Sequence, residues 1–342
     1  MVNQALNEAV QKIRKAGLAK FKGRSEATFW KEKDFLDRAV NAGVVILPTL
    51  GCRWGRNSGC TMCGYVYDSW NNSQEEILRQ FKAVMKNFED IKYLKIFNSG
   101  SFFDSSEISQ DTAKKIFSEI NRRSEIIQVQ VESRPEFITE DALAVKEKLN
   151  AEFEIGIGLE TTSDYIRENC INKNFTLEDF KKALKICRNS GVKVKAYLLV
   201  KPPFLSEREA IGDAIASAVD ACKLGADRIS FNPVNIQRAT LVEYLWRKGE
   251  YSPPWLWSIA EILKSVKKKM KIPVLSHPTA AGKQRGAHNC GECDSKVYYG
   301  IIDFSAEQNE EHLNLNCNCG CKEKWKAQLE LEQFEHGSEH RM

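Results

Sequence analysis

Three cysteines near the start of the chain have the spacing best suited to chemistry. Cys52, Cys60 and Cys63 lie in GCRWGRNSGCTMCGY with the spacing C-x7-C-x2-C. Three thiolates are one short of a structural zinc site, and no histidine lies nearby to complete one. A 4Fe-4S cluster held by three cysteines leaves one iron open to a substrate or cofactor. The pattern therefore predicts such a cluster. A zinc loop completed from elsewhere and a chance grouping are the alternatives.

A second group of cysteines lies near the end of the chain and surrounds SKVYYGIIDF, which we expect to be hairpin-like. Close pairs of cysteines around a short stretch are typical of zinc ribbons, where the metal replaces a core that the segment cannot build. We predict zinc here, with an auxiliary iron-sulfur cluster or structural thiols as alternatives. One of the last three cysteines is expected to be spare, and His288 is an alternative ligand. The candidate ligands are Cys290, Cys293, Cys317, Cys319 and Cys321.

The remaining cysteines and the composition limit the class of protein. Cys170, Cys187 and Cys222 fall within helical patterns and are expected to be buried, inert thiols. Eleven cysteines without an export signal indicate a reducing compartment, so we expect a cytoplasmic protein. No apolar run approaches the roughly 18 residues of a membrane span. The net charge of +4 neither requires nor excludes nucleic acid.

The elements that position these cysteines alternate between strand and helix. A helix over 176–191 is indicated by Thr176 as cap with Asp179, and by an apolar stripe that ends at Cys187. Strict alternation predicts a parallel sheet, and six units favour an open, partial (β/α)6 barrel with catalytic groups at the carboxyl ends of its strands. The strand-like runs are 44–49, 93–97, 126–132, 153–159, 192–200 and 227–233.

The chain outside this alternation predicts two further parts. Residues 1–40 are expected to form a helical extension, residues 41–275 the barrel, and residues 276–342 a small Cys-rich module stabilised by metal. Five lysines within 264–271 and basic residues around the second cysteine group are a candidate RNA footprint, with Trp325 as an aromatic that could stack on a base. A solvated helix face is the alternative.

A cysteine triplet after the first strand of such a barrel resembles the radical S-adenosylmethionine (SAM) enzymes. Their usual spacing is C-x3-C-x2-C, and the longer first gap is similar to branches that include the Elongator catalytic subunit and tRNA methylthiotransferases. The resemblance implies a 4Fe-4S cluster and SAM as cofactors. It also implies that Met62, the residue before the last cysteine, packs beside the SAM adenine.

Later segments line up with the same family. The loop of Asn98, Ser99, Gly100 and Ser101 corresponds to the glycine-rich loop that receives the amino group of SAM. ESRPE, which begins at Glu132, and the segment that begins at Glu160 resemble the Elongator-like branch, so both carboxylates are candidate catalytic and cofactor-binding residues. The resemblance also places three residues at the ends of the last strands near the cofactor: Lys201, Pro202 and Asn232.

Within this superfamily the cysteine loop most resembles the radical SAM family of archaeosine biosynthesis. That resemblance implies a tRNA substrate with a lysine adduct of 7-cyano-7-deazaguanine, a lysine-transferring archaeosine synthase partner, an electron donor, and cleavage of a carbon-nitrogen bond. Two alternatives stay open. One is another radical SAM modification of RNA, by methylthiolation or side-chain addition. The other is a non-enzymatic, metal-stabilised RNA-binding protein, which would not need six βα units.

Overall fold

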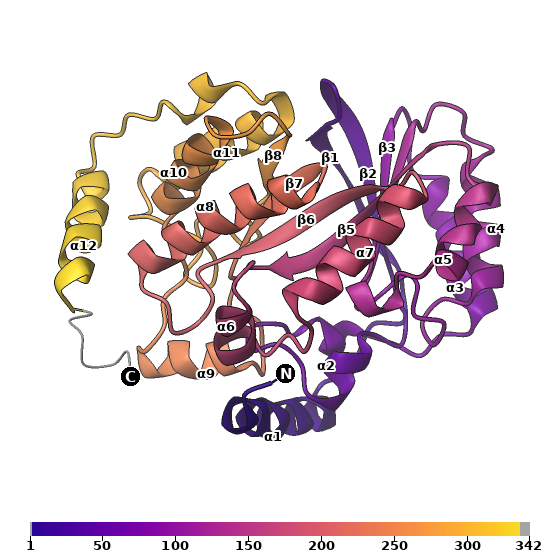
Figure 1. The fold of residues 1–342 in the computed structure, drawn as a ribbon, viewed down its shortest axis with the longest axis horizontal. Coiled ribbons are helices and arrows are strands. Elements are labelled where there is room, and N and C mark those ends of the chain that lie inside the picture. Colours follow the sequence, from indigo (N-terminus) through magenta and orange to yellow (C-terminus); the bar gives the residue numbers. More distant parts are fainter. Residues whose placement is uncertain (1, 336–342) are drawn as a thin grey trace.

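The computed structural model describes residues 2–335, and one eight-stranded sheet runs through it (Figure 1). The strands follow one another across the sheet in chain order; β1 is antiparallel to β2, and all later pairs are parallel. This sequential parallel order is that of a partial α/β barrel. The strands are β1 (Thr28–Phe35), β2 (Ala39–Leu47), β3 (Tyr93–Asn98), β4 (Gln128–Glu132), β5 (Glu152–Glu160), β6 (Lys193–Val200), β7 (Arg228–Pro233) and β8 (Val274–Ser276).

The six predicted strand-like runs are confirmed as β2 to β7, and two strands were not predicted. β8 extends the sheet at one side. β1 lies inside the segment 1–40, which is helical only over α1 (Gln4–Lys20), so the prediction of an all-helical extension is wrong. Alternate residues of β1 face inward, but two of them, Glu32 and Asp34, are charged. The apolar-polar alternation that marks a strand is therefore hidden.

Helices connect the strands and cover the sheet. α7 (Leu177–Asn189) begins with the predicted capping box between Thr176 and Asp179, and its predicted apolar stripe is buried. Cys170 and Cys187 are buried as expected, and burial raises the pKa of each thiol to about 12; Cys222 is only partly buried against the core. The other helices are α2 (Arg53–Asn57), α3 (Gln74–Met85), α4 (Gln110–Ile120), α5 (Glu140–Leu143), α6 (Asp164–Ile166), α8 (Glu207–Leu224), α9 (Leu241–Lys248), α10 (Leu256–Lys267), α11 (Asp294–Glu307) and α12 (Cys321–Glu335).

The segment after β8 packs on the barrel as helix, not as hairpin. SKVYYGIIDF lies within α11, so the hairpin prediction is wrong. Its aromatic and β-branched residues suggested strand, yet Val297, Ile301 and Phe304 have the i, i+4, i+7 spacing of a helix face, and all three are buried. Trp325 of α12 is also buried, and its indole N–H donates to Ser258 Oγ at 2.9 Å. It is therefore not free to stack on a base.

Buried charges fill the amino end of the barrel interior. Arg228 of β7 donates to Asp34 of β1 at 2.8 Å, and Lys95 of β3 pairs with both Asp34 and Glu32. Glu32, Asp34 and His277 place one ligand atom each within 4.8 Å of one another. Lys95 already supplies the cation that these carboxylates need, so no metal is required there. Among the described residues, no helix is both long and apolar enough to cross a membrane.

Candidate active site at the carboxyl end of the barrel

The three-cysteine loop is held in shape by hydrogen bonds to its backbone. Cys52 caps the start of α2, and its backbone N–H donates to Ser99 O at 2.9 Å. From α1, the buried Arg14 side chain donates to the carbonyls of Ser58 at 2.8 Å and Cys63 at 2.6 Å. The N-terminal helix therefore fixes the last cysteine of the loop.

A second clamp comes from the segment around Cys170. Asn172, in the left-handed region at φ +58°, donates from its side chain to Gly59 O at 2.8 Å and accepts from the Trp54 indole N–H at 2.7 Å through its own carbonyl. Thr61 donates to Ile171 O at 2.9 Å. The loop is thus shaped before any group binds, as a preorganised site requires.

The surroundings of the three thiols fit an iron-sulfur cluster. Burial raises the pKa of Cys60 to about 12, while the nearby cations Lys173 and Arg134 act in the opposite direction. A buried thiolate needs such compensation or a metal. Among the described residues, these three sulfurs do not all lie within 4.8 Å of one another, unlike those of four C-terminal cysteines.

The predicted SAM loop, residues 98–101, is organised by a carboxylate that the sequence did not point to. Glu107 is buried and accepts from Thr49 Oγ1 at 2.7 Å, Asn98 Nδ2 at 2.8 Å and the Ser101 N–H at 2.8 Å. A Cβ at Gly100 would lie 1.9 Å from Glu107 Oε1, so only glycine fits there. The glycine therefore allows the backbone to close over the carboxylate.

The two predicted carboxylates lie at the ends of neighbouring strands and interact with the same cation. Glu160 pairs with Lys173 at 2.5 Å, and Lys173 also favours the charged form of Glu132. Burial nevertheless raises the pKa of Glu132 to about 7, against the opposing effects of Tyr197, Lys195 and Lys173. Glu132 therefore changes charge near neutral pH, as a proton-transferring group must.

The remaining residues predicted to contact the cofactor lie at the ends of β6 and β7 or in the cysteine loop. Lys201, with φ +61°, directs its ammonium group to Glu207 at 2.8 Å, and its carbonyl accepts from the Tyr251 hydroxyl at 2.6 Å, so its ammonium group is directed to Glu207 and not to a cofactor. Asn232 lies beside Leu199 in the sheet register, and Pro202 is buried next to Lys201. Met62 packs in one apolar cluster with Cys60 and Leu199. The strand ends and the cysteine loop thus meet at one edge of the sheet.

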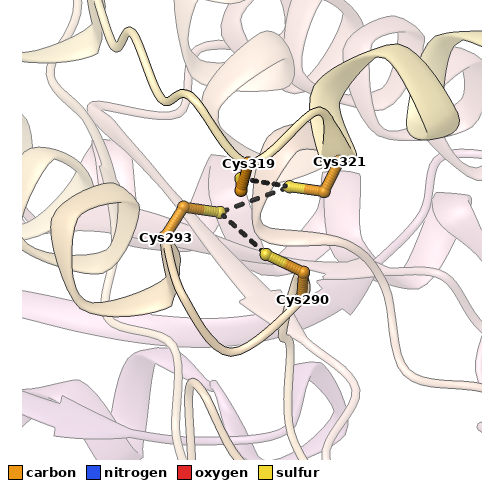
Figure 2. Close-up of side chains that lie close together, drawn as sticks. All are labelled: Cys290, Cys293, Cys319 and Cys321. Carbon is orange, nitrogen blue, oxygen red and sulfur yellow. Dashed lines mark hydrogen bonds between the residues drawn. The ribbon is translucent and has the colours of Figure 1, made fainter.

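Four of the five C-terminal cysteines converge, as Figure 2 shows. The Sγ atoms are 3.9 Å apart for Cys290 and Cys293, 3.3 Å for Cys293 and Cys321, and 3.3 Å for Cys319 and Cys321. All four lie within 4.8 Å of one another, and Cys317 is not in the group. Among the described residues, Cys317 is therefore the one of the five C-terminal cysteines that lies outside this group.

A chain of buried hydrogen bonds leads from this cluster to the loop after β6. The Trp257 indole N–H donates to Cys321 Sγ at 3.2 Å, and the next residue, Ser258, donates to Glu207 at 2.5 Å. Glu207 in turn pairs with Lys201. The C-terminal cysteines and the loop after β6 are therefore parts of one packed unit.

Comparisons with known proteins show the family of this chain. A model of the radical SAM superfamily matches residues 46–214. Archaeosine synthase subunit beta of Methanosarcina acetivorans is 42% identical over 98% of this chain and 99% of its own length, and the protein of that name from Thermococcus kodakarensis is 37% identical over 84% and 91%. Elp3 of Methanocaldococcus infernus superposes with a TM-score of 0.52 at 18% identity, over 71% of this chain and 60% of its own, which shows a common fold. The chain therefore belongs to the radical SAM superfamily, within the family of the archaeosine synthase beta subunits.

Proposed function

We propose that this chain breaks the carbon-nitrogen bond in a lysine adduct of 7-cyano-7-deazaguanine in tRNA and so leaves the formamidine of archaeosine. The observation that carries the proposal is the 42% identity, over nearly the whole of both chains, to a protein named archaeosine synthase subunit beta. The preformed three-cysteine loop, with two carboxylates at the neighbouring strand ends, supports a radical SAM reaction at this site. The name of that relative implies a second subunit, which we take to be the lysine-transferring partner. An external electron donor is also needed.

In this proposal Cys52, Cys60 and Cys63 would hold the 4Fe-4S cluster. SAM would lie between Met62, the loop 98–101 and the strand ends that carry Glu132, Glu160, Lys201, Pro202 and Asn232. When bound, the cluster and SAM would supply an electron and a 5′-deoxyadenosyl radical able to take hydrogen from the lysine carbon next to the linking nitrogen. Release of the nitrogen as the formamidine then requires that this carbon lose one electron, which would return to the cluster, and take up water, so that the lysine skeleton leaves as an aldehyde. Apolar strand ends exclude water from this site.

The protein's own polar groups orient the reactants and handle protons. Lys173 pairs with Glu160 through their 2.5 Å contact and so holds this carboxylate in place at the end of β5. Glu132, with its pKa near 7, accepts or releases a proton at its carboxylate at the pH of the cytoplasm, where we place the reaction. Glu107 keeps the loop 98–101 closed and ready for an amino group.

The test uses anaerobically reconstituted protein and tRNA whose lysine adduct carries deuterium on the carbon next to the linking nitrogen. We expect deuterium in 5′-deoxyadenosine and archaeosine in the tRNA. Changing Cys52, Cys60 or Cys63 to alanine should abolish SAM cleavage, whereas Cys222→Ala, a matched loss of a thiol outside the loop, should not. If deuterium never transfers from this tRNA but does from tRNA with an unmodified wobble uridine, another radical SAM modification takes the place of this one.

We also propose that Cys290, Cys293, Cys319 and Cys321 bind a structural zinc ion. A tetrahedron of four thiolates with Zn–S bonds of about 2.3 Å has S–S separations of about 3.8 Å. The distances of 3.3 to 3.9 Å between neighbouring sulfurs support this size of site over that of a four-iron cluster. Metal analysis after purification tests it: one equivalent of zinc is expected, and iron without zinc would contradict it.

A further inference from the structure

The lysine run at 264–271 lies at the wrong end of the barrel to guide a substrate to the site. α10 ends at Lys267, and β8 begins at Val274 beside the first residues of β7, since Ile229 N donates to Pro273 O at 3.0 Å. In Figure 1, β8 lies near the top, whereas α1, α2 and α9 lie along the bottom. Lys264 and Lys267 also contact Asn314 and Gln308. The run is therefore at the amino edge of the sheet, opposite the cysteine loop.

Arginines instead gather next to the cysteine loop, and the first pair shares Asp68. Arg238 donates to Asp68 at 2.7 Å, and its guanidinium lies 4.5 Å from the centre of the Phe21 ring. Arg24 lies 3.7 Å from the same carboxylate, and 67% of its side chain is exposed. Asp68 ends the short helical turn Tyr65–Asp68, which is separated from Cys63 by Gly64 alone. This pair is therefore attached to the loop itself.

A second pair repeats the arrangement around Glu243 of α9. Arg285 donates to Glu243 at 2.8 Å, and its guanidinium lies 5.0 Å from the centre of the Trp246 ring. Arg247 donates to the same carboxylate at 3.1 Å, and 67% of its side chain is exposed. In each pair one arginine is held on an aromatic ring, while the other extends toward solvent.

The segment 236–243 joins the two pairs. Arg285 Nε donates to Ile236 O at 3.0 Å, and Gln237 Oε1 accepts from the N–H of Gly64, the residue after Cys63, at 2.5 Å. Ala239 N donates to Glu243 at 2.7 Å. The two pairs thus flank the point where the chain leaves the cysteine loop.

The charges of these pairs do not cancel. Each carboxylate is shared by two guanidinium groups, so each pair keeps one excess positive charge. Guanidinium forks match phosphate oxygens, and groups already held by a ring and a carboxylate lose little entropy on binding. Tyr244, 53% exposed on the same helix as Arg247, offers a ring for a base. RNA combines regularly placed phosphates with exposed bases and so suits this surface better than an acidic protein face.

We propose that the pairs Arg24/Arg238 and Arg247/Arg285 are contacts of this protein with the RNA backbone and that they bring the tRNA to the cysteine loop. The proposal rests on the proposed function, because it takes RNA as the substrate. It assigns no such role to the lysine run.

The test compares two double variants that each lose two positive charges. R24Q/R247Q removes the exposed member of each pair and keeps both ring contacts, whereas K268Q/K269Q removes two exposed lysines from the run. Binding of an unmodified tRNA transcript is measured between 50 and 200 mM salt. We expect R24Q/R247Q to reduce the slope of log affinity against log salt by about 1.4 to 1.8, at 0.7 to 0.9 per phosphate, and K268Q/K269Q to leave it unchanged. R24K/R247K should restore most of the slope, because it restores the charge.

The possible outcomes separate this proposal from the proposed function. Equal slopes for R24Q/R247Q and the wild type, or a larger loss in K268Q/K269Q, overturn the arginine assignment alone. If R24Q/R247Q binds tRNA normally but no longer binds the partner subunit, the surface is a protein interface, and the proposed RNA contact is overturned. If the wild type shows no salt-dependent affinity for tRNA, the result contradicts the proposed function itself and not only the assignment of the arginines. SAM cleavage without RNA should be the same in all variants, which shows that each is folded.

Discussion

Glu132→Gln is expected to stabilise the protein at neutral and higher pH and to leave its stability unchanged in acid. Glu132 ends β4 inside the barrel, where burial raises the pKa of its carboxyl from 4.5 to about 7. The folded protein therefore binds this proton more tightly than the unfolded chain does. As a consequence, stability is lost as the pH rises from about 4.5 through about 7.

The size of the effect follows from the two pKa values. At 1.36 kcal/mol per pH unit, the change from 4.5 to about 7 corresponds to about 3 kcal/mol of unfolding free energy lost above pH 7. Glutamine has nearly the same shape and does not titrate, so the variant escapes this loss. We expect E132Q to exceed the wild type by up to about 3 kcal/mol at pH 8, by less than about 1 kcal/mol at pH 5, and to match it below about pH 4.

The assay is urea unfolding of the cluster-free protein in reducing buffer at pH 5, 6, 7 and 8, followed by tryptophan fluorescence. Glu152→Gln is the control, because Glu152 is 62% exposed and pairs only with the half-exposed Lys193. This surface pair contributes less than about 1 kcal/mol at every pH. A difference between E132Q and the wild type that does not change with pH would refute the reasoning, as would a variant that is less stable at pH 8.

Three further predictions concern residues that hold the site. Glu107→Ala should cost about 3 kcal/mol or more in urea unfolding and weaken SAM binding, because it leaves three buried donors without an acceptor; a loss below 1 kcal/mol would contradict this role. Cys293→Ser should release zinc while Cys317→Ser retains one equivalent by metal analysis, and equal zinc in both would disprove the ligand set. Glu207→Gln should destabilise the protein by about 3 kcal/mol because Lys201 is left as a buried, unpaired charge; adding Lys201→Met should recover part of that loss, and no recovery would argue against the pairing.

Features that depend on neighbours in the sequence were predictable, and those that depend on distant contacts were not. The six βα units and the cysteine loop follow from local periodicity and spacing. By contrast, Glu107 lies outside any motif, and only the folded chain shows that it holds residues 98–101. The choice of four cysteines from five likewise depends on how α11 and α12 meet.

Two errors have the same physical origin, since tertiary contacts overrode local pattern. β1 is a strand although its inward residues are charged, because Asp34 meets Arg228 across the barrel. α11 is a helix although its residues favour strands, because Val297, Ile301 and Phe304 are buried together in the core. For the lysine run, the composition suggested an RNA-binding site, and the direction of α10 shows that the run lies at the amino edge of the sheet. Its role in binding RNA stays a prediction that K268Q/K269Q tests.

The pair between Asp34 and Arg228 has a consequence for how the chain folds during synthesis. The two residues are 194 positions apart in the sequence. At roughly 5 to 20 residues per second, about 10 to 40 s pass on the ribosome before Asp34 can meet its partner. β1 also packs against α11, which begins only at Asp294. β1 can pair early with β2, but its contacts with Arg228 and α11 form only after those residues have been synthesised, so the barrel is not completed strand by strand as the chain emerges.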